Sequence, residues 1–419
     1  MRHVLGLKQW KWQRIGALAA AVCGVGVGLL KGLQPVAWLG IGSALILTCS
    51  VLTLYFVMLA CPKIRNGRLL LSFVMVAFLS LVLNPPEAGF RAWERLGFFL
   101  LMLGLLSPLV DNSLLRRLRP MMWRGMMWGF RVVVVLSFMG FLSLCAGVKF
   151  LNNGYWMSFS GVTAGGMLLA PVTAVVLIDL LWRMLGQSVR RWTFWGMLTA
   201  SVAAGAMMLQ AGSRIATLGV LGAVVVMLWF RRRRLRNLRR HPVAAALLVI
   251  IALGTAVLIV PRVSDTIAHK FRIGSNHSSL TYSRDIKWEG RLEEFRSAPV
   301  FGIGFATQRV FSRQFDNETR SRSTGVVEPG SSWLSVLAQT GIAGFLLLSV
   351  FNLKLIIALL RRQRPEDGSG FYLAMLAFLL INGIAEGWIL YAGSAMFFPY
   401  WVLSGLIAQD SSPKTINHD

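Results

Sequence analysis

The stretch WLSVLAQTGIAGFLLLSVFNLKLIIALL, residues 333–360, is an apolar run with a single charged side chain, Lys354. About 20 consecutive apolar residues are enough for a helix to cross the hydrocarbon core of a bilayer. Eleven further apolar runs, some of them shorter, occur along the chain. We therefore expect an all-α polytopic membrane protein with about twelve transmembrane helices, at residues 15–30, 36–60, 69–83, 96–110, 126–148, 162–182, 192–211, 215–230, 243–260, 333–360, 371–389 and 394–408.

The composition of the 419 residues agrees with this fold class. Hydrophobic residues make up 55% of the chain and charged residues only 14%, whereas soluble domains carry about 25% charged residues. A water-soluble enzyme and a disordered chain are therefore both excluded. The net charge of +26 suits either a nucleic-acid binder or a membrane protein with basic cytoplasmic loops. The basic residues lie between the apolar runs, which favours the membrane protein.

The basic residues alternate from one connection to the next. Connections on the side of the N-terminus are rich in arginine and lysine, and those on the other side carry one or two each, such as Lys31 and Arg214. The positive-inside rule then predicts an inner-membrane protein with both termini in the cytoplasm. The arginine cluster at 231–240 would face anionic lipid rather than nucleic acid, so membrane lipids are the expected partners there.

One connection differs from the others. Residues 261–332 are mostly polar and lie on the outer side, between the ninth and tenth predicted spans. Within them, residues 283–296 have a helical pattern that ends at Ala298-Pro299. We expect a folded, partly helical loop on the outer side of the membrane, with a disordered spacer as the alternative. The chain then divides into 1–260, 261–332, 333–408 and a cytoplasmic tail at 409–419.

No residue cluster indicates a metal or a nucleotide. The four cysteines lie in or beside apolar runs without the close spacing of a zinc site, and the histidines of the outer connection, His269 and His277, lack a metal-like partner at helical spacing. A glycine loop with lysine that could hold the phosphates of ATP is not present either. We therefore expect no metal and no cofactor.

Several polar residues lie where the outer connection meets the membrane. Arg214 begins a span on the side that is otherwise poor in basic residues, and suits either an anion site or an interfacial position. Arg284, Trp288 and Arg291 fall on one helical face, which suits a phosphate beside a sugar or prenyl group, or a plain surface helix.

Two more sites follow further along the chain. The stretch from Glu328 to Trp333 re-enters the membrane and is either functional or a simple junction. Glu386 falls near the outer end of the predicted span 371–389, where a carboxylate is costly and indicates function. Arg131, Asp179 and Lys354 lie nearer the cytoplasmic ends, where they are expected to pair or to extend to the interface.

These sites together resemble the O-antigen ligase and polymerase superfamily. Ser213-Arg214 is similar to the first arginine of the family. Arg284-Asp285-Ile286-Lys287-Trp288 and Pro299-Val300-Phe301-Gly302-Ile303-Gly304 resemble its arginine-x-x-x-tryptophan and proline-x-phenylalanine-glycine-x-glycine stretches. Ser331, nine residues and Gly341-Ile342-Ala343-Gly344 resemble the ligase motif His-[Asn/Ser/Gln]-x9-Gly-x-x-Gly. The histidine of that motif is replaced by Gly330.

The resemblance implies a GT-C-like, metal-independent inverting glycosyltransferase. It implies that polysaccharide passes from undecaprenyl pyrophosphate to lipid A–core oligosaccharide at the periplasmic face, with Arg214, Arg284, Arg291 and Trp288 at the donor pyrophosphate. The family histidine helps to activate the acceptor hydroxyl, and Glu328, Glu386 and His277 are the substitutes that this sequence offers. An O-antigen or exopolysaccharide polymerase that joins undecaprenyl-linked repeat units is the nearest alternative. A transporter would show charged or broken helices at mid-membrane.

Overall fold

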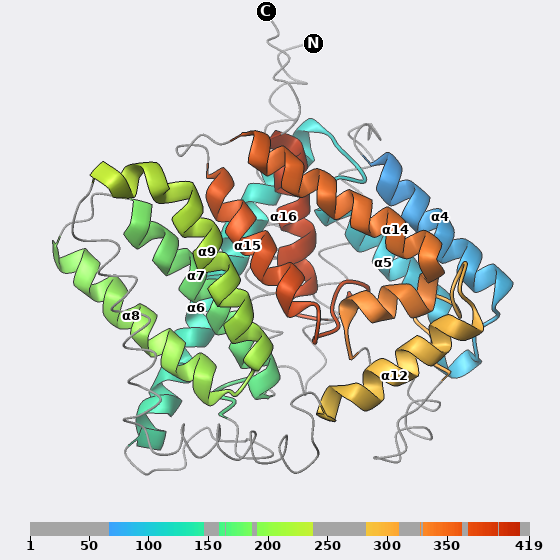
Figure 1. Cartoon of the computed structure of the whole chain (residues 1–419), viewed down its shortest axis with the longest axis horizontal. Helices are drawn as coiled ribbons and strands as arrows, with labels where there is room; N and C mark the ends of the chain where they lie inside the picture. Colours follow the sequence, from blue (N-terminus) through green and yellow to red (C-terminus); the bar gives the residue numbers. More distant parts are fainter. Residues whose placement is uncertain are drawn as a thin grey trace, which may run out of the picture.

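The protein is described here by a computed structural model at residues 67–145, 159–163, 165–186, 191–237, 282–309, 327, 330–362, 368–392 and 394–410. Every regular element within these ranges is helical, and none of these residues forms a strand. The helices, labelled as in Figure 1, are α4 (Arg68–Leu83), the short 3-10 helix η1 (Ala88–Phe90), α5 (Ala92–Leu106), α6 (Ser113–Cys145), α7 (Gly166–Gly186), α8 (Arg191–Gln210), α9 (Arg214–Asn237), α12 (Tyr282–Ser297), α14 (Ser332–Arg361), α15 (Ser369–Asn382) and α16 (Phe397–Asp410).

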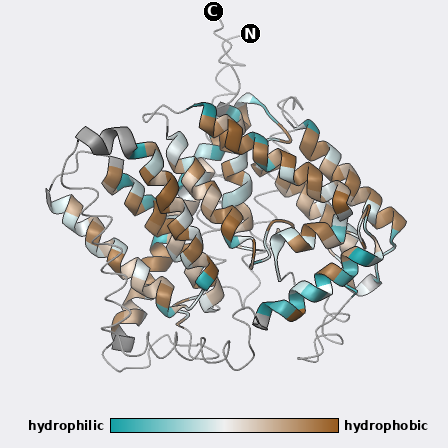
Figure 2. Ribbon diagram, in the orientation of Figure 1, coloured by the Kyte–Doolittle hydropathy of each residue, from teal (hydrophilic) through white to brown (hydrophobic). Residues whose placement is uncertain are grey.

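Five of these helices are long and apolar enough to cross a membrane: α6, α7, α8, α9 and α14. Helices α4 and α15 are apolar but shorter. The hydropathy colouring in Figure 2 shows the long helices as mostly apolar and α12 as the most polar helix of the view. The fold is that of a polytopic membrane protein. Three predicted spans, 15–30, 36–60 and 243–260, lie outside the described residues, so the number of twelve stays a prediction.

Helices α15 and α16 lie between two groups, with α6 to α9 on one side and α4, α5 and α14 on the other (Figure 1). Glycines let α9 approach α15 closely, because a Cβ at Gly219 would meet the ring of Phe378 at 2.7 Å. At the other end of the pair, Phe230 lies against Gly370. The two helices are therefore antiparallel. Their register carries Arg214, at the start of α9, to the level of the residues that follow α15.

The arginines at 116–124 fall between the predicted spans 96–110 and 126–148, where a loop is expected, and this expectation is wrong. They lie in the first turns of α6, which begins at Ser113 rather than at 126. Arg119 is fully buried and donates to the carbonyl oxygens of Ser107 and Val110, just after the end of α5. Helix ends leave carbonyls without partners, and a guanidinium with several N–H groups satisfies them.

The predicted pairing inside the bundle is confirmed for two of the three residues. Arg131 on α6 contacts Asp179 on α7 with an N–O distance of 2.6 Å, and Arg183 joins the same carboxylate at 3.1 Å. Because it is paired, the carboxylate of Asp179 can lie between α6 and α7, where an unpaired charge would be costly. Lys354 is exposed on α14.

Helix α14 is broken at Gly341, which has φ +65° and ψ −170°. The segment 299–303 fits into the break. The amides of Ile342 and Ala343 donate to the carbonyls of Pro299 and Val300 at 2.9 and 3.2 Å, and the amide of Ile303 donates to Ala338 at 2.9 Å. A Cβ at Gly341 would overlap the backbone of Val300. The glycine motif at 299–304 and the one at 341–344 are therefore joined by backbone hydrogen bonds, although they lie far apart in the sequence.

Candidate functional site

The site is built at the meeting point of α12, the start of α14 and the connection after α15. Helix α12 agrees with the predicted helix at 283–296. Arg284 lies in its first turn and forms an ion pair with Glu386, with 2.5 Å between Nη2 and Oε1. The side chains of Arg284 and Glu386 are 16% and 20% exposed, so the pair is shielded but reachable from solvent.

Glu386 was expected inside a span, and this expectation is wrong. Helix α15 ends at Asn382 instead of near 389, so Glu386 lies in the connection that follows. Ser332 explains the early end, because its backbone amide and hydroxyl replace the helical hydrogen bonds. Its hydroxyl donates to the carbonyl of Glu386 at 2.7 Å and accepts from the amide of Trp388 at 2.9 Å. The start of α14 therefore fixes the backbone of Glu386.

Burial raises the pKa of the Glu386 carboxyl. The charges of Arg284 and Lys287 and the hydrogen bond from Arg284 act in the opposite direction and keep this rise smaller than burial alone would make it. A carboxylate with a raised pKa is a better proton acceptor than an exposed one. The chemistry available at this position is therefore acid–base as well as structural.

Gly330, the position of the family histidine, lies against α12. The indole of Trp288 donates to the carbonyl of Gly330 at 3.4 Å. Gly330 has φ +63°, and a Cβ there would lie 2.9 Å from Cβ of Lys287. This left-handed backbone conformation favours glycine, so the structure itself explains why a glycine stands at position 330. The next residue, Ser331, caps α14 by accepting from the amide of Leu334 at 3.4 Å.

The structure thus brings together Arg284, Trp288, Gly330 and Glu386. Glu328 and His277 lie outside the described residues. Arg214 is exposed at the first residue of α9, where the hydroxyl of Ser213 accepts from the amide of Ala216 at 3.4 Å. The antiparallel register with α15 puts Arg214 at the same end of the bundle as Glu386, and Figure 1 shows the starts of α9 and α12 toward the same lower edge of the view.

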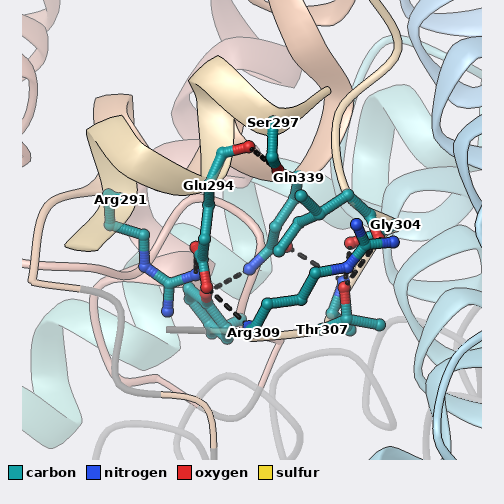
Figure 3. A network of polar contacts seen from close by, with 10 residues as sticks. Arg291, Glu294, Ser297, Gly304, Thr307, Arg309 and Gln339 are labelled. Atoms are coloured by element: carbon teal, nitrogen blue, oxygen red, sulfur yellow. Dashed lines mark hydrogen bonds and ion pairs between the residues drawn. The ribbon is translucent and has the colours of Figure 1, made fainter. Parts of the chain in front are cut away.

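Arg291 shares helix α12 with Arg284, as predicted, but its side chain is buried in an ion pair and does not lie open beside Arg284. Its guanidinium contacts Glu294 at 2.6 Å, and the two side chains are only 2% and 1% exposed. The other carboxylate oxygen of Glu294 accepts from the amide of Arg309 at 2.6 Å (Figure 3). Arg291 and Glu294 therefore fasten α12 to the segment that carries the glycine motif.

Sequence reasoning missed two residues of this buried network. Gln339 on α14 accepts from the amide of Ala306 at 2.9 Å and donates to the hydroxyl of Tyr391 at 2.7 Å. Burial raises the pKa of Tyr391, against the nearby charge of Arg291. A signal for Gln339 was present, because it is an uncharged polar residue within the apolar run 333–360 and such residues in membrane helices usually bind a partner.

Comparison with known proteins adds the family. Residues 199–349 match the family model described as O-antigen ligase. The matched range includes Arg214, helix α12, Gly330 and the break in α14. None of the curated proteins compared with the chain matches it. Residues 199–349 are therefore similar to the O-antigen ligase family, and this similarity supports a relation to the O-antigen ligase superfamily.

Proposed function

We propose that this protein is an O-antigen ligase of the bacterial inner membrane. In this proposal it transfers undecaprenyl-pyrophosphate-linked O-antigen polysaccharide to lipid A–core oligosaccharide at the periplasmic face, with both termini in the cytoplasm. The superfamily itself implies a glycosyltransferase-like membrane enzyme and a lipid-linked glycan. Our proposal adds the identity of the donor, the identity of the acceptor and the periplasmic location of residues 261–332.

The observation that carries the proposal is the place of Arg284. It lies within the matched region, at the end of the bundle where Arg214 begins α9, and its side chain is only partly exposed. A guanidinium binds phosphate oxygens with two parallel hydrogen bonds. Arg214 and Arg284 would together stabilise the negative charge that develops on the leaving pyrophosphate, and no metal is needed for this electrostatic effect. Trp288, one turn after Arg284, would lie beside the first sugar.

The transfer itself is one displacement. The acceptor hydroxyl attacks the anomeric carbon, the bond from that carbon to the pyrophosphate oxygen breaks, and the electron pair leaves with the pyrophosphate. A single displacement inverts the configuration at the sugar. Metal independence remains a prediction, and it is tested by transfer in excess chelator.

Gly330 favours one alternative function. The ligase motif has histidine at this position, so its replacement suits a polymerase that joins two undecaprenyl-linked repeats. The spacing from Ser331 to Gly341-Ile342-Ala343-Gly344 favours the ligase.

The deciding experiment is the lipopolysaccharide profile of a deletion strain. Loss of O-antigen-capped chains together with accumulation of full-length undecaprenyl-linked polymer is the result expected for a ligase. Lipid A–core that carries a single repeat would instead identify a polymerase. Unchanged lipopolysaccharide would contradict an O-antigen ligase and an O-antigen polymerase, and loss of exopolysaccharide would then identify an exopolysaccharide polymerase.

A further inference from the structure

The side chain proposed to bind the donor is already occupied in this structure. The Nη2 atom of Arg284 lies 2.5 Å from the carboxylate of Glu386. Carboxylate and pyrophosphate oxygens are both acceptors for the same N–H groups of a guanidinium. A donor pyrophosphate that binds Arg284 in the same way must therefore displace Glu386.

Only the side chain of Glu386 is free to respond. Its backbone carbonyl accepts from the hydroxyl and the amide of Ser332 at 2.7 and 3.1 Å, and these contacts hold the connection to α14. The side chain is 20% exposed and lies beside α12. When the carboxylate leaves Arg284, it stays near α12 because the backbone of Glu386 is held by Ser332.

We propose that Glu386 acts twice in the reaction: it closes Arg284 in the resting enzyme, and after the donor has taken Arg284 it accepts the proton of the acceptor hydroxyl. This inference rests on the proposed transfer reaction. It assigns the base to Glu386 in a chain whose family histidine is replaced by Gly330. It also sets an order of binding, with the donor before the acceptor.

The proton and electron balance is complete without another reactant. The hydroxyl oxygen forms the new bond to the anomeric carbon, and its proton moves to a carboxylate oxygen of Glu386. The pyrophosphate leaves with the electron pair of the broken bond and remains bound to Arg214 and Arg284. Glu386 then loses its proton to water and pairs again with Arg284 once the pyrophosphate has gone.

The surroundings of Glu386 support this sequence of events. The positive groups that face it are Arg284 and Lys287, and both lower the pKa of its carboxyl against the effect of burial. A pyrophosphate that binds Arg284 removes the hydrogen bond and part of the positive charge that lower the pKa of the Glu386 carboxyl. The carboxyl then becomes a stronger base at the moment when the acceptor arrives.

The test separates donor binding from transfer. Glu386→Gln keeps the size of the side chain but removes its charge, so purified full-length protein should bind farnesyl pyrophosphate several-fold more tightly than the wild type. Transfer from a polyprenyl-pyrophosphate-linked glycan should fall by about 10²–10⁴-fold, the usual effect of a positioned base. Glu289→Gln is the matched control on α12, where the side chain is exposed, and it should change neither quantity.

Each outcome has a distinct meaning. Donor binding that is unchanged or weaker in Glu386→Gln would overturn the closing role, and normal transfer would overturn the base. Added formate should restore part of the transfer in Glu386→Ala, and a folded variant without any rescue would also contradict the base. Arg284→Ala tests the proposed function separately: if it binds donor and transfers normally, the pyrophosphate site fails, whatever Glu386 does.

Discussion

Helix α12 carries two arginine–glutamate pairs of nearly equal length that differ in their surroundings. Arg291 and Glu294 are 2.6 Å apart with both side chains almost fully buried, whereas Arg284 and Glu386 are 2.5 Å apart and remain 16% and 20% exposed. The first pair lies within one helix, and the second joins α12 to the connection after α15. A sealed pair cannot exchange partners with a ligand, but a reachable pair can. Two turns of one helix thus separate a buried ion pair from one that a ligand can reach.

The largest effect is expected from breaking the sealed pair. Glu294→Ala leaves the guanidinium of Arg291 buried without its carboxylate, which typically costs about 3–5 kcal/mol of folding stability. The melting temperature of the purified protein should fall strongly. The double change Arg291→Met with Glu294→Leu is the control, since replacing both charges with apolar groups is often nearly neutral. A Glu294→Ala variant as stable as the wild type would remove the distinction between the two pairs.

The next effect concerns activity rather than folding. Arg284→Ala should lower transfer by about 10²–10³-fold, the loss typical of one group that stabilises a developing negative charge. The melting temperature should change little. Arg284→Lys should recover only part of the transfer, because an ammonium lacks the planar two-pronged contact. If Arg284→Ala instead unfolds the protein, then the reachable pair is structural too.

A smaller effect is expected at Gly330. Alanine there must adopt φ +63° and approach Lys287, which should cost about 1–2 kcal/mol for the left-handed backbone. Asparagine, which tolerates this conformation better, should cost less. Thermal melting of Gly330→Ala and Gly330→Asn measures the difference. Equal stability of glycine and alanine at this position would show that the backbone does not require glycine.

The smallest effect is expected at the end of the buried network. Tyr391→Phe removes the hydroxyl that accepts from Gln339 at 2.7 Å. The loss should be about 1 kcal/mol, the usual net value of one hydrogen bond. Denaturant titration of the two proteins checks it. No loss of stability would mean that water or another group replaces Tyr391.

Local patterns in the sequence predicted α12 well. The helical pattern at 283–296 and the stop at Ala298-Pro299 predict where the helix begins and ends. The observed bounds, 282 and 297, differ from the predicted ones by only one residue at each end. The end of α15 could not be predicted in the same way. The run 371–389 is largely apolar on both sides of Asn382-Gly383 and Glu386, and the hydrogen bonds that hold the backbone after the helix come from Ser332 in another part of the chain.

The candidate site shows the same division. Spacing along a helix placed Arg284 and Arg291 on one face, but whether each side chain is open or sealed depends on Glu386 and on the segment near Arg309. The pairing of Gln339 with Tyr391 likewise needs two segments to meet. Periodicity in a sequence reports which residues share a helix face, and it does not report what covers that face.

The break at Gly341 has a consequence for how the chain is made. The carbonyls of Pro299 and Val300 and the amide of Ile303 find their hydrogen-bond partners in residues 338–343, which leave the ribosome later. At synthesis rates of about 5–20 residues per second, the wait lasts on the order of seconds. During that interval the glycine motif lacks its contacts with α14, although Asn84 can already donate to the carbonyl of Gly302. A chain that terminates before Gly341 never provides the contacts with Ile342 and Ala343. Premature termination there would therefore yield a protein with the earlier helices but without an assembled site.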